Sequence, residues 1–366
     1  MRNSTHPFPW AVPLRPCLPI NPMDPVALLT RMVEIPSLSG EETVLATFLV
    51  EVMRTLGFRA EIDVAGNAVG VLGDGEQDIV LLGHMDTVPG AIPVRVVDGK
   101  LYGRGSVDAK GPLAAFIAAA AEVGRRAGKR IVVVGATEEE AASSKGARHV
   151  ARTLAPTCCI IGEPSGTRAI TLGYKGRVVL AYEASAGTTH SASPGANVLE
   201  EGVEFWNRLR RWAEAFNVGK AMFDRVDPAL RAIESHNDGL TESLTLRASI
   251  RIPPGLTSAG VQREVEALAP GSASLRFWGA DPPYRAEKNT ALVRAFLKAV
   301  RAEGLGPVFK VKSGTSDMNV VGPAWNCPIV AYGPGDSNLD HTPNEHLDLA
   351  EYRQAIRILA RVLRTV

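Results

Sequence analysis

Three short and nearly uninterrupted apolar runs constrain the fold of this chain more than any other feature. The runs are DIVLLG (78–83), RIVVVGA (130–136) and CCIIG (158–162). A strand with one solvated face alternates apolar and polar residues, so continuous runs indicate strands buried on both faces. An Ala-rich segment with helical character, beginning near Pro112, lies between the first two runs. This order predicts the α/β class, with a mixed sheet flanked by helices.

The segments before the first run predict two helices and a hairpin. Asp24 and Pro25 suit the cap and the first residue of a helix. Ser39 is predicted to cap the next helix, with Glu42 three positions later completing a capping box. The stretch RAEIDVAGNAVGVLG then reads as two strands joined by a turn at Gly66–Asn67.

Composition limits the classes of function. The 366 residues carry a formal net charge of +1, which predicts no nucleic-acid partner. Every apolar run ends before about 18 residues, so no membrane span is expected.

The cysteines lack a CxxC spacing and suit a reducing, cytoplasmic location; a metal role for the adjacent Cys158 and Cys159 is the less favoured alternative. Seven prolines fall within the first 25 residues, so residues 1–22 are expected to form a disordered arm, with Met23 an alternative start.

Polar groups follow several of the predicted strands. Carboxyl ends of neighbouring parallel strands meet at one edge of a sheet, where chemistry gathers in α/β folds. Side chains two apart in a strand share a face, so one member of the first pair can bind while the other orients it. Two imidazoles and several carboxylates without a thiol suit a pair of zinc-like ions. The groups are His84, Asp86, Asp108, Glu138–Glu140, Glu163 and His341.

Each of these residues has a simpler explanation when taken alone. His84 could be a hydrogen-bonded histidine at a strand end, and the glutamates could open a solvated helix. Asp108 could cap the helix that follows it, and Glu163, before Pro164, could belong to a turn. Their coincidence at successive strand ends favours a shared site.

An ordered set of motifs identifies the chain as similar to a known family. The motifs lie between residues 24 and 366 and are GHMDTVP, YGRGSVDAKGPLAA, TEEEAASSKGA, GEPSG, GYKGRV, THSASPGAN, GTSDMN and DHTPNEH. They resemble the M20 family of co-catalytic zinc peptidases and deacylases. The resemblance implies an amide hydrolase that uses two divalent metal ions, most often zinc, with cobalt as an alternative.

The resemblance also implies roles for individual residues. It assigns one metal to His84, Asp108 and Glu163 and the second to Asp108, Glu140 and His341, with Asp86 orienting His84. Glu139 would be the general base. Gly146 lies six residues after Glu140, which supports this register; the alternative makes Glu138 the base and Glu139 the ligand.

The middle of the chain predicts a separate module. Its pattern is β-α-β-β-α-β, with one strand placed near residues 232–235, and indicates a ferredoxin-like α+β domain. It would be inserted at 176–283 into a catalytic domain formed by 23–175 and 284–366. In the family this module is a lid that also forms a homodimer interface. The resemblance makes His190 an oxyanion-stabilising residue and Arg251 a carboxylate-binding residue; otherwise they are a loop histidine and a surface arginine.

A narrower resemblance concerns the substrate. KSGTSDMN (312–319) and YGPGDSNLDHTPNEH (332–346) resemble the lysine/ornithine hydrolases that act on an amino-group carrier protein. This implies release of lysine or ornithine from the terminal glutamate of an acidic carrier, in lysine and arginine biosynthesis. Alternatives are a deacylase of the acetylornithine or succinyl-diaminopimelate type, a small dipeptidase or carboxypeptidase, and a non-catalytic protein with this fold. Basic residues at 125–130 and 208–211 are candidates for carrier docking.

Overall fold

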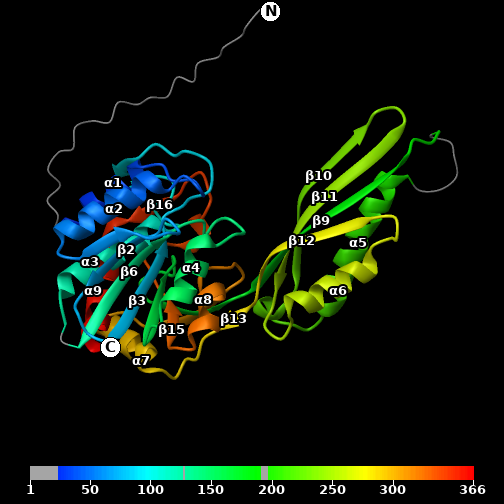
Figure 1. Ribbon diagram of the computed structural model, residues 1–366. Helices are drawn as coiled ribbons and strands as arrows, with labels where there is room; N and C mark the ends of the chain where they lie inside the picture. Colours follow the sequence, from blue (N-terminus) through cyan, green and yellow to red (C-terminus); the bar gives the residue numbers. More distant parts are fainter. Residues whose placement is uncertain (1–23, 127, 191–196) are drawn as a thin grey trace, which may run out of the picture.

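The computed structural model describes residues 24–126, 128–190 and 197–366, so the predicted arm at 1–22 lies outside the described residues. The chain forms a large body around a mixed sheet and a smaller body around a second sheet (Figure 1). The large sheet has the order β1-β2-β6-β3-β7-β15-β8-β13, and β14 pairs with β8. Both chain-terminal helices, α1 (Pro25–Glu34) and α9 (Leu349–Thr365), belong to the large body.

The three apolar runs form buried strands, as predicted, and these strands are the central parallel ones of the large sheet. They correspond to β3 (Gln77–His84), β6 (Lys129–Ala136) and β7 (Cys158–Gly162), and β15 (Ile329–Ala331) continues the parallel set. Antiparallel pairing on either side makes the sheet mixed. The flanking strands are β1 (Arg59–Ile62), β2 (Ala68–Leu72), β8 (Ala169–Tyr174), β13 (Tyr284–Arg285) and β14 (Val308–Lys312).

Helices cover both faces of this sheet. Ile79 and Leu81 of β3 pack into one core, whereas Val80 and Leu82 pack into a second core on the opposite face. Successive strand side chains point to opposite faces, which is why a continuous apolar run was needed. The first core includes α1, α2 (Thr43–Thr55), α3 (Lys110–Val123), α7 (Ala291–Ala302) and α9; the second includes α4 (Lys145–Thr153) and α8 (Met318–Trp325). The predicted α/β class with a flanked mixed sheet is confirmed.

The smaller body has the predicted element order. Its sheet order, β10-β11-β9-β12, is the ferredoxin-like arrangement. The strand expected near 232–235 is longer than predicted and forms β10 (Asp227–Asn237). Its role as a lid, its role in dimerisation and the predicted domain boundaries stay predictions. The remaining elements are β9 (Gly176–Gly187), α5 (Val198–Phe216), η1 (Met222–Asp224), β11 (Thr241–Ile252), α6 (Ser258–Leu268) and β12 (Ser274–Asp281).

One predicted helix cap is wrong. Asp24 does cap α1, accepting a hydrogen bond from the Val26 amide. Ser39, however, does not cap α2, which begins after Glu42 without a side-chain cap. Ser39 Oγ instead donates to Asp86 Oδ2, because the end of β3 lies beside it.

A small third sheet connects two loops of the candidate site. β16 (His346–Asp348) pairs with β5 (Lys100–Tyr102), which pairs with β4 (Arg95–Val97). This pairing joins the loop after η2 (Ser337–Leu339), which carries His341, to the loop that carries Asp108. Across the described ranges, no helix is long and apolar enough to cross a bilayer.

Candidate metal centre and active site

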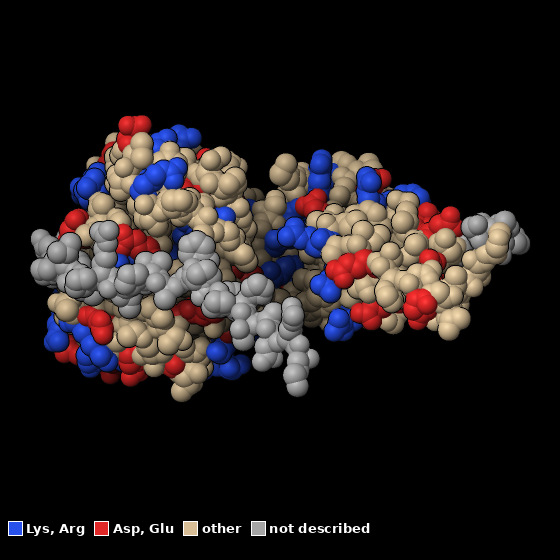
Figure 2. Space-filling view, turned by 90° about the horizontal axis from the view of Figure 1, so that it is seen from above, with Lys and Arg blue, Asp and Glu red and all other residues tan. Residues whose placement is uncertain are grey.

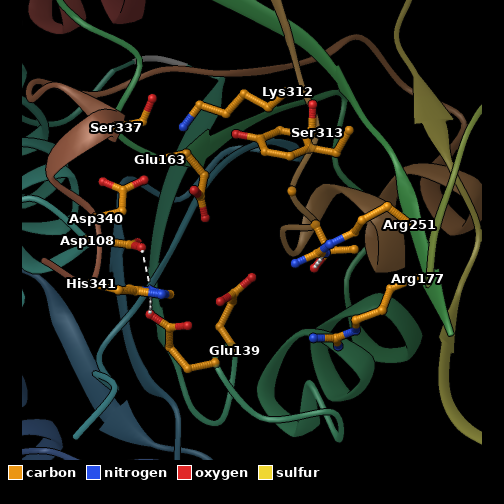
Figure 3. Close-up of a pocket in the computed structure, with 14 residues that line it drawn as sticks. Asp108, Glu139, Glu163, Arg177, Arg251, Lys312, Ser313, Ser337, Asp340 and His341 are labelled. Carbon is orange, nitrogen blue, oxygen red and sulfur yellow. Dashed lines mark hydrogen bonds and ion pairs between the residues drawn. The ribbon is translucent and has the colours of Figure 1, made fainter. Parts of the chain in front are cut away.

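The predicted site residues of the large body gather at the carboxyl edge of the parallel strands. His84 is the last residue of β3, Glu139 and Glu140 follow β6, and Glu163 follows β7. The three glutamates border a cleft of about 300 Å³ between the two bodies (Figure 3), whereas His84 is buried next to Asp108. The residues that line it include Asp108, Glu139, Glu140, Glu163, Tyr174, Arg177, Arg251, Lys312, Asp340 and His341.

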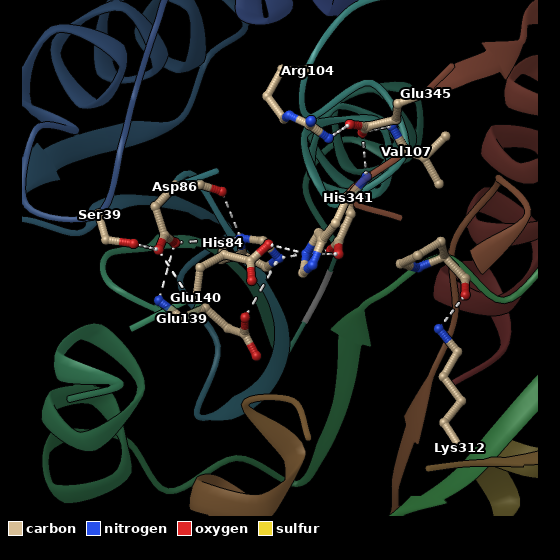
Figure 4. A network of polar contacts seen from close by, with 12 residues as sticks. Ser39, His84, Asp86, Arg104, Val107, Glu139, Glu140, Lys312, His341 and Glu345 are labelled. Atoms are coloured by element: carbon tan, nitrogen blue, oxygen red, sulfur yellow. Dashed lines mark hydrogen bonds and ion pairs between the residues drawn. The ribbon is translucent and has the colours of Figure 1, made fainter. Parts of the chain in front are cut away.

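Asp86 holds the His84 imidazole from behind. His84 Nδ1 lies 3.0 Å from the Asp86 main-chain oxygen and 3.4 Å from Asp86 Oδ1. The Asp86 carboxylate also accepts hydrogen bonds from the amides of Glu139 and Glu140, both at 3.0 Å, and from Ser39 Oγ at 2.7 Å (Figure 4). These contacts turn His84 Nε2 away from Asp86 and join β3 to the glutamate loop. Sequence reasoning missed Ser39, because its spacing to Glu42 matches a capping box.

Two groups of possible ligands share Asp108. His84, Asp108 and Glu163 place ligand atoms within 4.8 Å of one another, and so do Asp108, Glu140 and His341. His341 Nε2 lies 2.8 Å from Glu140 Oε1 and 3.1 Å from Asp108 Oδ2, whose other oxygen lies 3.3 Å from His84 Nε2. Nitrogen and oxygen donors around a shared carboxylate suit a pair of divalent ions. A further group, His84 with Glu139 and Glu140, meets the same distance limit.

The carboxylates of this cluster have strongly shifted pKa values. Burial, and then the charge of Asp108, raise the pKa of Glu163 to about 8. Burial also raises the pKa of Glu139 well above its ordinary value, although His84 opposes this effect. For Asp108 burial acts in the same upward direction, but hydrogen bonds to His341 and His84 hold its pKa well below the usual range.

The neighbouring carboxylates favour the protonated, positively charged form of both histidines. Hydrogen bonds to Asp108 and Glu140 raise the pKa of His341 to about 10. Burial alone would lower the pKa of His84, but its contacts with Asp108 and Asp86 raise it well above its ordinary value. The protons on the histidines therefore sit where divalent cations would be bound by the same atoms.

Of the three consecutive glutamates, Glu139 and Glu140 line the cleft, whereas Glu138 does not. Glu138 has a left-handed backbone, with φ 57°, and its amide donates to Glu42 Oε1. Its carboxylate accepts a hydrogen bond of 2.6 Å from Ser143 Oγ. Glu139 and Glu140 line the cleft instead. The geometry thus directs two consecutive glutamates, and not Glu138, toward the candidate ligands.

Two arginines of the smaller body face the cleft. Arg177 of β9 and Arg251 of β11 are direct cross-strand partners, and both line the cleft. Arg251 Nη1 donates to Thr315 Oγ1 at 3.0 Å, and burial followed by the charge of Arg177 lowers its pKa. Like charges directly opposite each other destabilise a sheet, so this pair suits the binding of an anion. Seen from above, Lys and Arg side chains gather where the smaller body faces the larger one (Figure 2). Sequence reasoning missed Arg177 because its pairing with Arg251 depends on strand register.

His190 is not brought into the cleft of its own chain. It is exposed and follows the end of β9, at Gly187, whereas Arg177 near the start of β9 lines the cleft. Ten residues of extended strand separate Arg177 from Gly187, which corresponds to roughly 33 Å. Residues 191–196 are not described. The predicted role of His190 therefore stays a prediction.

A buried glutamate that sequence reasoning left without a role fixes the loop of Asp108. Glu345 Oε1 accepts from the amides of Val107, at 3.0 Å, and Asp108, at 3.1 Å. Its other oxygen accepts from Arg104 Nη1 at 2.7 Å (Figure 4). The signal for this residue was its place in the motif DHTPNEH, four residues after His341.

The fold and this cluster are those of a metal-dependent hydrolase, and the family match shows that the protein belongs to this class. The chain belongs to peptidase family M20/M25/M40, whose family model matches residues 80–365. The membership predicted from the motifs is confirmed, as is the prediction that the protein is an enzyme.

Curated relatives match almost the whole chain. The chain is 48% identical over 344 residues to the LysW-lysine hydrolase of Deinococcus radiodurans, covering 92% of this chain and 95% of the relative. It is 38% identical over 345 residues to the putative LysW-lysine/LysW-ornithine hydrolase of Thermococcus kodakarensis, covering 94% and 92%.

Solved structures with low sequence identity share the fold. The M20 family metallo-carboxypeptidase Sso-CP2 of Sulfolobus solfataricus superimposes with a TM-score of 0.75 at 16% identity, covering 93% of this chain and 99% of that one. The YXEP protein of Bacillus subtilis, described as a dinuclear metal-binding peptidase of the M20 family, has a TM-score of 0.68 at 15% identity, covering 93% and 98%.

Proposed function

We propose that this hydrolase releases lysine, ornithine or both from the terminal glutamate of a LysW-type amino-group carrier protein. The observation that carries the proposal is the 48% identity to a LysW-lysine hydrolase over 92% of the chain. The proposed process is lysine biosynthesis, and arginine biosynthesis if ornithine is released. The proposed location is the cytoplasm.

Two divalent ions are proposed as cofactors, zinc first and cobalt as the alternative. His84, Asp108 and Glu163 would hold one ion, and Asp108, Glu140 and His341 would hold the other. The two ligand groups around Asp108 support this assignment. When bound, the ions supply Lewis-acid activation of the scissile carbonyl and of water.

The chain's own groups then handle the proton and the charge. Glu139 takes a proton from the attacking water and delivers it to the nitrogen of the leaving amino acid as the amide C–N bond breaks. Glu139 lines the cleft, and its Oε2 lies 4.0 Å from His84 Nε2. This position supports the role of general base. Arg251, together with Arg177, binds a carboxylate of the substrate.

A homodimer formed through the smaller body would complete the site. In it the partner subunit's His190 stabilises the tetrahedral oxyanion. The position of His190, away from its own cleft, supports an action between subunits.

The test is a comparison of substrates with the metal-loaded enzyme. LysW-lysine and LysW-ornithine conjugates are compared with N-acetylornithine and N-succinyl-diaminopimelate by kcat/KM, with Glu139→Gln protein as the control for contaminating activity. A strong preference for the carrier conjugates is expected. Their kcat/KM should fall more steeply with salt than that of the small substrates, because salt screens charge steering beyond about 8 Å. Equal efficiency on the small substrates would leave only the generic deacylase.

A further inference from the structure

The strand that leads into the cleft has an open edge. Strand β14 pairs in parallel with β8, and no other described strand pairs with it. Phe309 is 47% exposed and Val311 is 40% exposed, although both are apolar. Proteins usually protect such an edge because its free main-chain groups can pair with another chain.

The hydrogen bonds of β14 show which groups are free. The Val308 amide donates to the Arg168 carbonyl at 3.0 Å, and the Lys312 carbonyl accepts from Lys175 at 3.2 Å. Main-chain groups of successive strand residues point to alternate sides. The register shifts between Lys310 and Lys312, but these two hydrogen bonds show that Val308 and Lys312, at the two ends of β14, both face β8. Phe309 and Val311 therefore direct their N–H and C=O groups toward the open side.

This edge runs toward the reacting groups. Lys312 and residues 313–315, which follow β14, line the cleft (Figure 3). A peptide whose last residue enters the cleft would therefore run in the same direction as β14. The five residues of β14 span about 16 Å, which fits roughly five residues of an extended tail.

The charges beside β14 favour an acidic tail. Lys310 and Lys312 share one face of the strand, and each ammonium donates to a main-chain carbonyl, at 2.9 and 2.5 Å. Arg168 is exposed beside Lys310 in a neighbouring groove. The groove also contains Glu351 and Asp336, whose carboxylates accept main-chain N–H groups. The Lys310 ammonium contacts a neutral partner, a main-chain carbonyl, so it can attract a carboxylate. The Lys312 ammonium also faces Glu163 and Asp340 of the cleft, where its charge lowers the pKa of both carboxyl groups against the effect of burial.

Five of the seven basic residues noted in the two sequence runs have partners elsewhere. Arg126 and Lys129 donate to the main-chain carbonyls of Leu363 and Val366 at the C-terminus. Arg130 pairs with Asp78. On α5, the arginines at 210 and 211 pair with glutamates of the same helix. None of these basic residues lines the cleft as described.

We propose that β14 is the docking edge for the carrier, whose acidic C-terminal tail adds to it as a parallel strand. Phe309 and Val311 supply main-chain hydrogen bonds, and Lys310, with the exposed Arg168 beside it, meets acidic side chains of the tail. The tail then delivers its terminal residue into the cleft. This inference rests on the proposed function, because it needs a substrate tethered to a protein.

The test removes one outward N–H group. Phe309→Pro deletes a donor that does not bond to β8, and edge strands tolerate proline at such positions. Its kcat/KM for the LysW-lysine conjugate should fall by roughly tenfold or more, mainly through KM, which is the scale of one or two main-chain hydrogen bonds. Hydrolysis of N-acetyl-lysine, a small free substrate, should stay at the wild-type level. Phe309→Ala keeps the N–H and should lose less.

A matched proline on the opposite edge is the control. The Asp63 amide donates to its partner Asn67 in the β1–β2 hairpin, so the neighbouring Ile62 directs its N–H outward. Ile62 is 41% exposed, as an edge residue is expected to be. Ile62→Pro should leave kcat/KM for the conjugate unchanged.

Hydrogen exchange gives a readout that does not depend on the proline variants folding. In metal-loaded Glu139→Gln protein, the amides of Phe309 and Val311 should exchange fast alone and become protected by the LysW-lysine conjugate. The docking edge is wrong if wild-type enzyme cleaves the conjugate while these amides stay unprotected. Loss of a dimer in Phe309→Pro, seen by light scattering, would assign the edge to a second copy of the chain instead. Failure of wild-type enzyme to cleave the conjugate would overturn the proposed function itself.

Discussion

At the scale of single residues, Asp86 shows how one buried carboxylate can organise a site. It contacts the imidazole of His84 and accepts hydrogen bonds from Ser39 and from the two amides of the glutamate loop. The spacing of His84 and Asp86 was visible in the sequence, because side chains two apart in a strand share a face. The contribution of Ser39 was not visible, because it crosses between segments 47 residues apart.

The first prediction separates the base from the ligand. Glu139→Gln should retain nearly normal metal content and lose about 10²–10⁴-fold in kcat, because only proton transfer is removed. Glu140→Gln should lose bound metal, since it removes a proposed ligand. Metal analysis and steady-state kinetics measure both effects. Glu138→Gln is the matched control and should stay near wild type; an inactive Glu138 variant beside an active Glu139 variant would reverse the register.

The second prediction concerns pH and metal affinity. In the metal-free protein the pKa of Glu163 is about 8 and that of His341 is about 10, both above ordinary values. Each group therefore keeps its proton at pH 7, and a divalent ion must displace that proton in order to bind. Affinity for zinc should rise between pH 6 and 8, by up to about tenfold per pH unit for each proton released.

Competition with a chelator at several pH values measures this affinity. Calorimetry in buffers of different ionisation enthalpy counts the protons that are released. Binding that is independent of pH and releases no proton would contradict the proposed ligands.

At the scale of elements, a buried aspartate joins the two bodies. Asp281, at the end of β12, lies 2.5 Å from Arg148 of α4 and 3.0 Å from Arg177 of β9. Its carboxylate is buried, whereas the Arg148 side chain is 41% exposed. Asp281 thus holds the cleft-lining Arg177 and connects the smaller body to a helix of the larger one.

The third prediction follows from this contact. Asp281→Ala leaves Arg177 without its partner in a largely buried position, so it should lower the free energy of unfolding by about 2–4 kcal/mol. The expected loss is below that of a fully buried pair because Arg148 can turn to solvent. Urea unfolding of the metal-loaded protein measures the change. Asp224→Ala, which removes an exposed carboxylate of η1, should shift stability by less than about 0.5 kcal/mol; equal shifts would show that the Asp281 contacts carry no stability.

The strands differed in how well their sequences predicted them. The central strands β3, β6 and β7 were predicted because burial on both faces requires apolar residues at every position. The ends of β10 were not predicted, since most of that strand is exposed and its residues are free to be polar. Strand β14 was not predicted either, because an open edge with exposed Phe309 and Val311 lacks a regular pattern.

At the scale of the whole molecule, the cleft is built by both bodies and His190 lies outside it. The large body provides the candidate metal ligands, and the smaller one provides Arg177 and Arg251. In the proposed dimer, the partner subunit's His190 reaches the site. Subunit mixing can test this arrangement without a structure of the dimer.

The fourth prediction is that two inactive variants complement each other. Glu139→Gln and His190→Ala homodimers should each be nearly inactive, but mixing them should restore activity, because a hybrid dimer contains one intact site. Subunit exchange is checked by mass spectrometry of isotope-labelled protein. Absence of recovery despite full exchange would place His190 outside a shared site.

The sequence by itself determined the buried strands, the class of fold and the family. It also identified most of the groups that the strand ends bring together. These features depend on local periodicity and on motifs, and both can be read along the chain. Only the tertiary structure decided that Glu138 faces away, that Ser39 and Glu345 support the site, and that Arg177 stands beside Arg251. Each of these depends on contacts between segments that are distant in sequence or on strand register, and no local pattern specifies either.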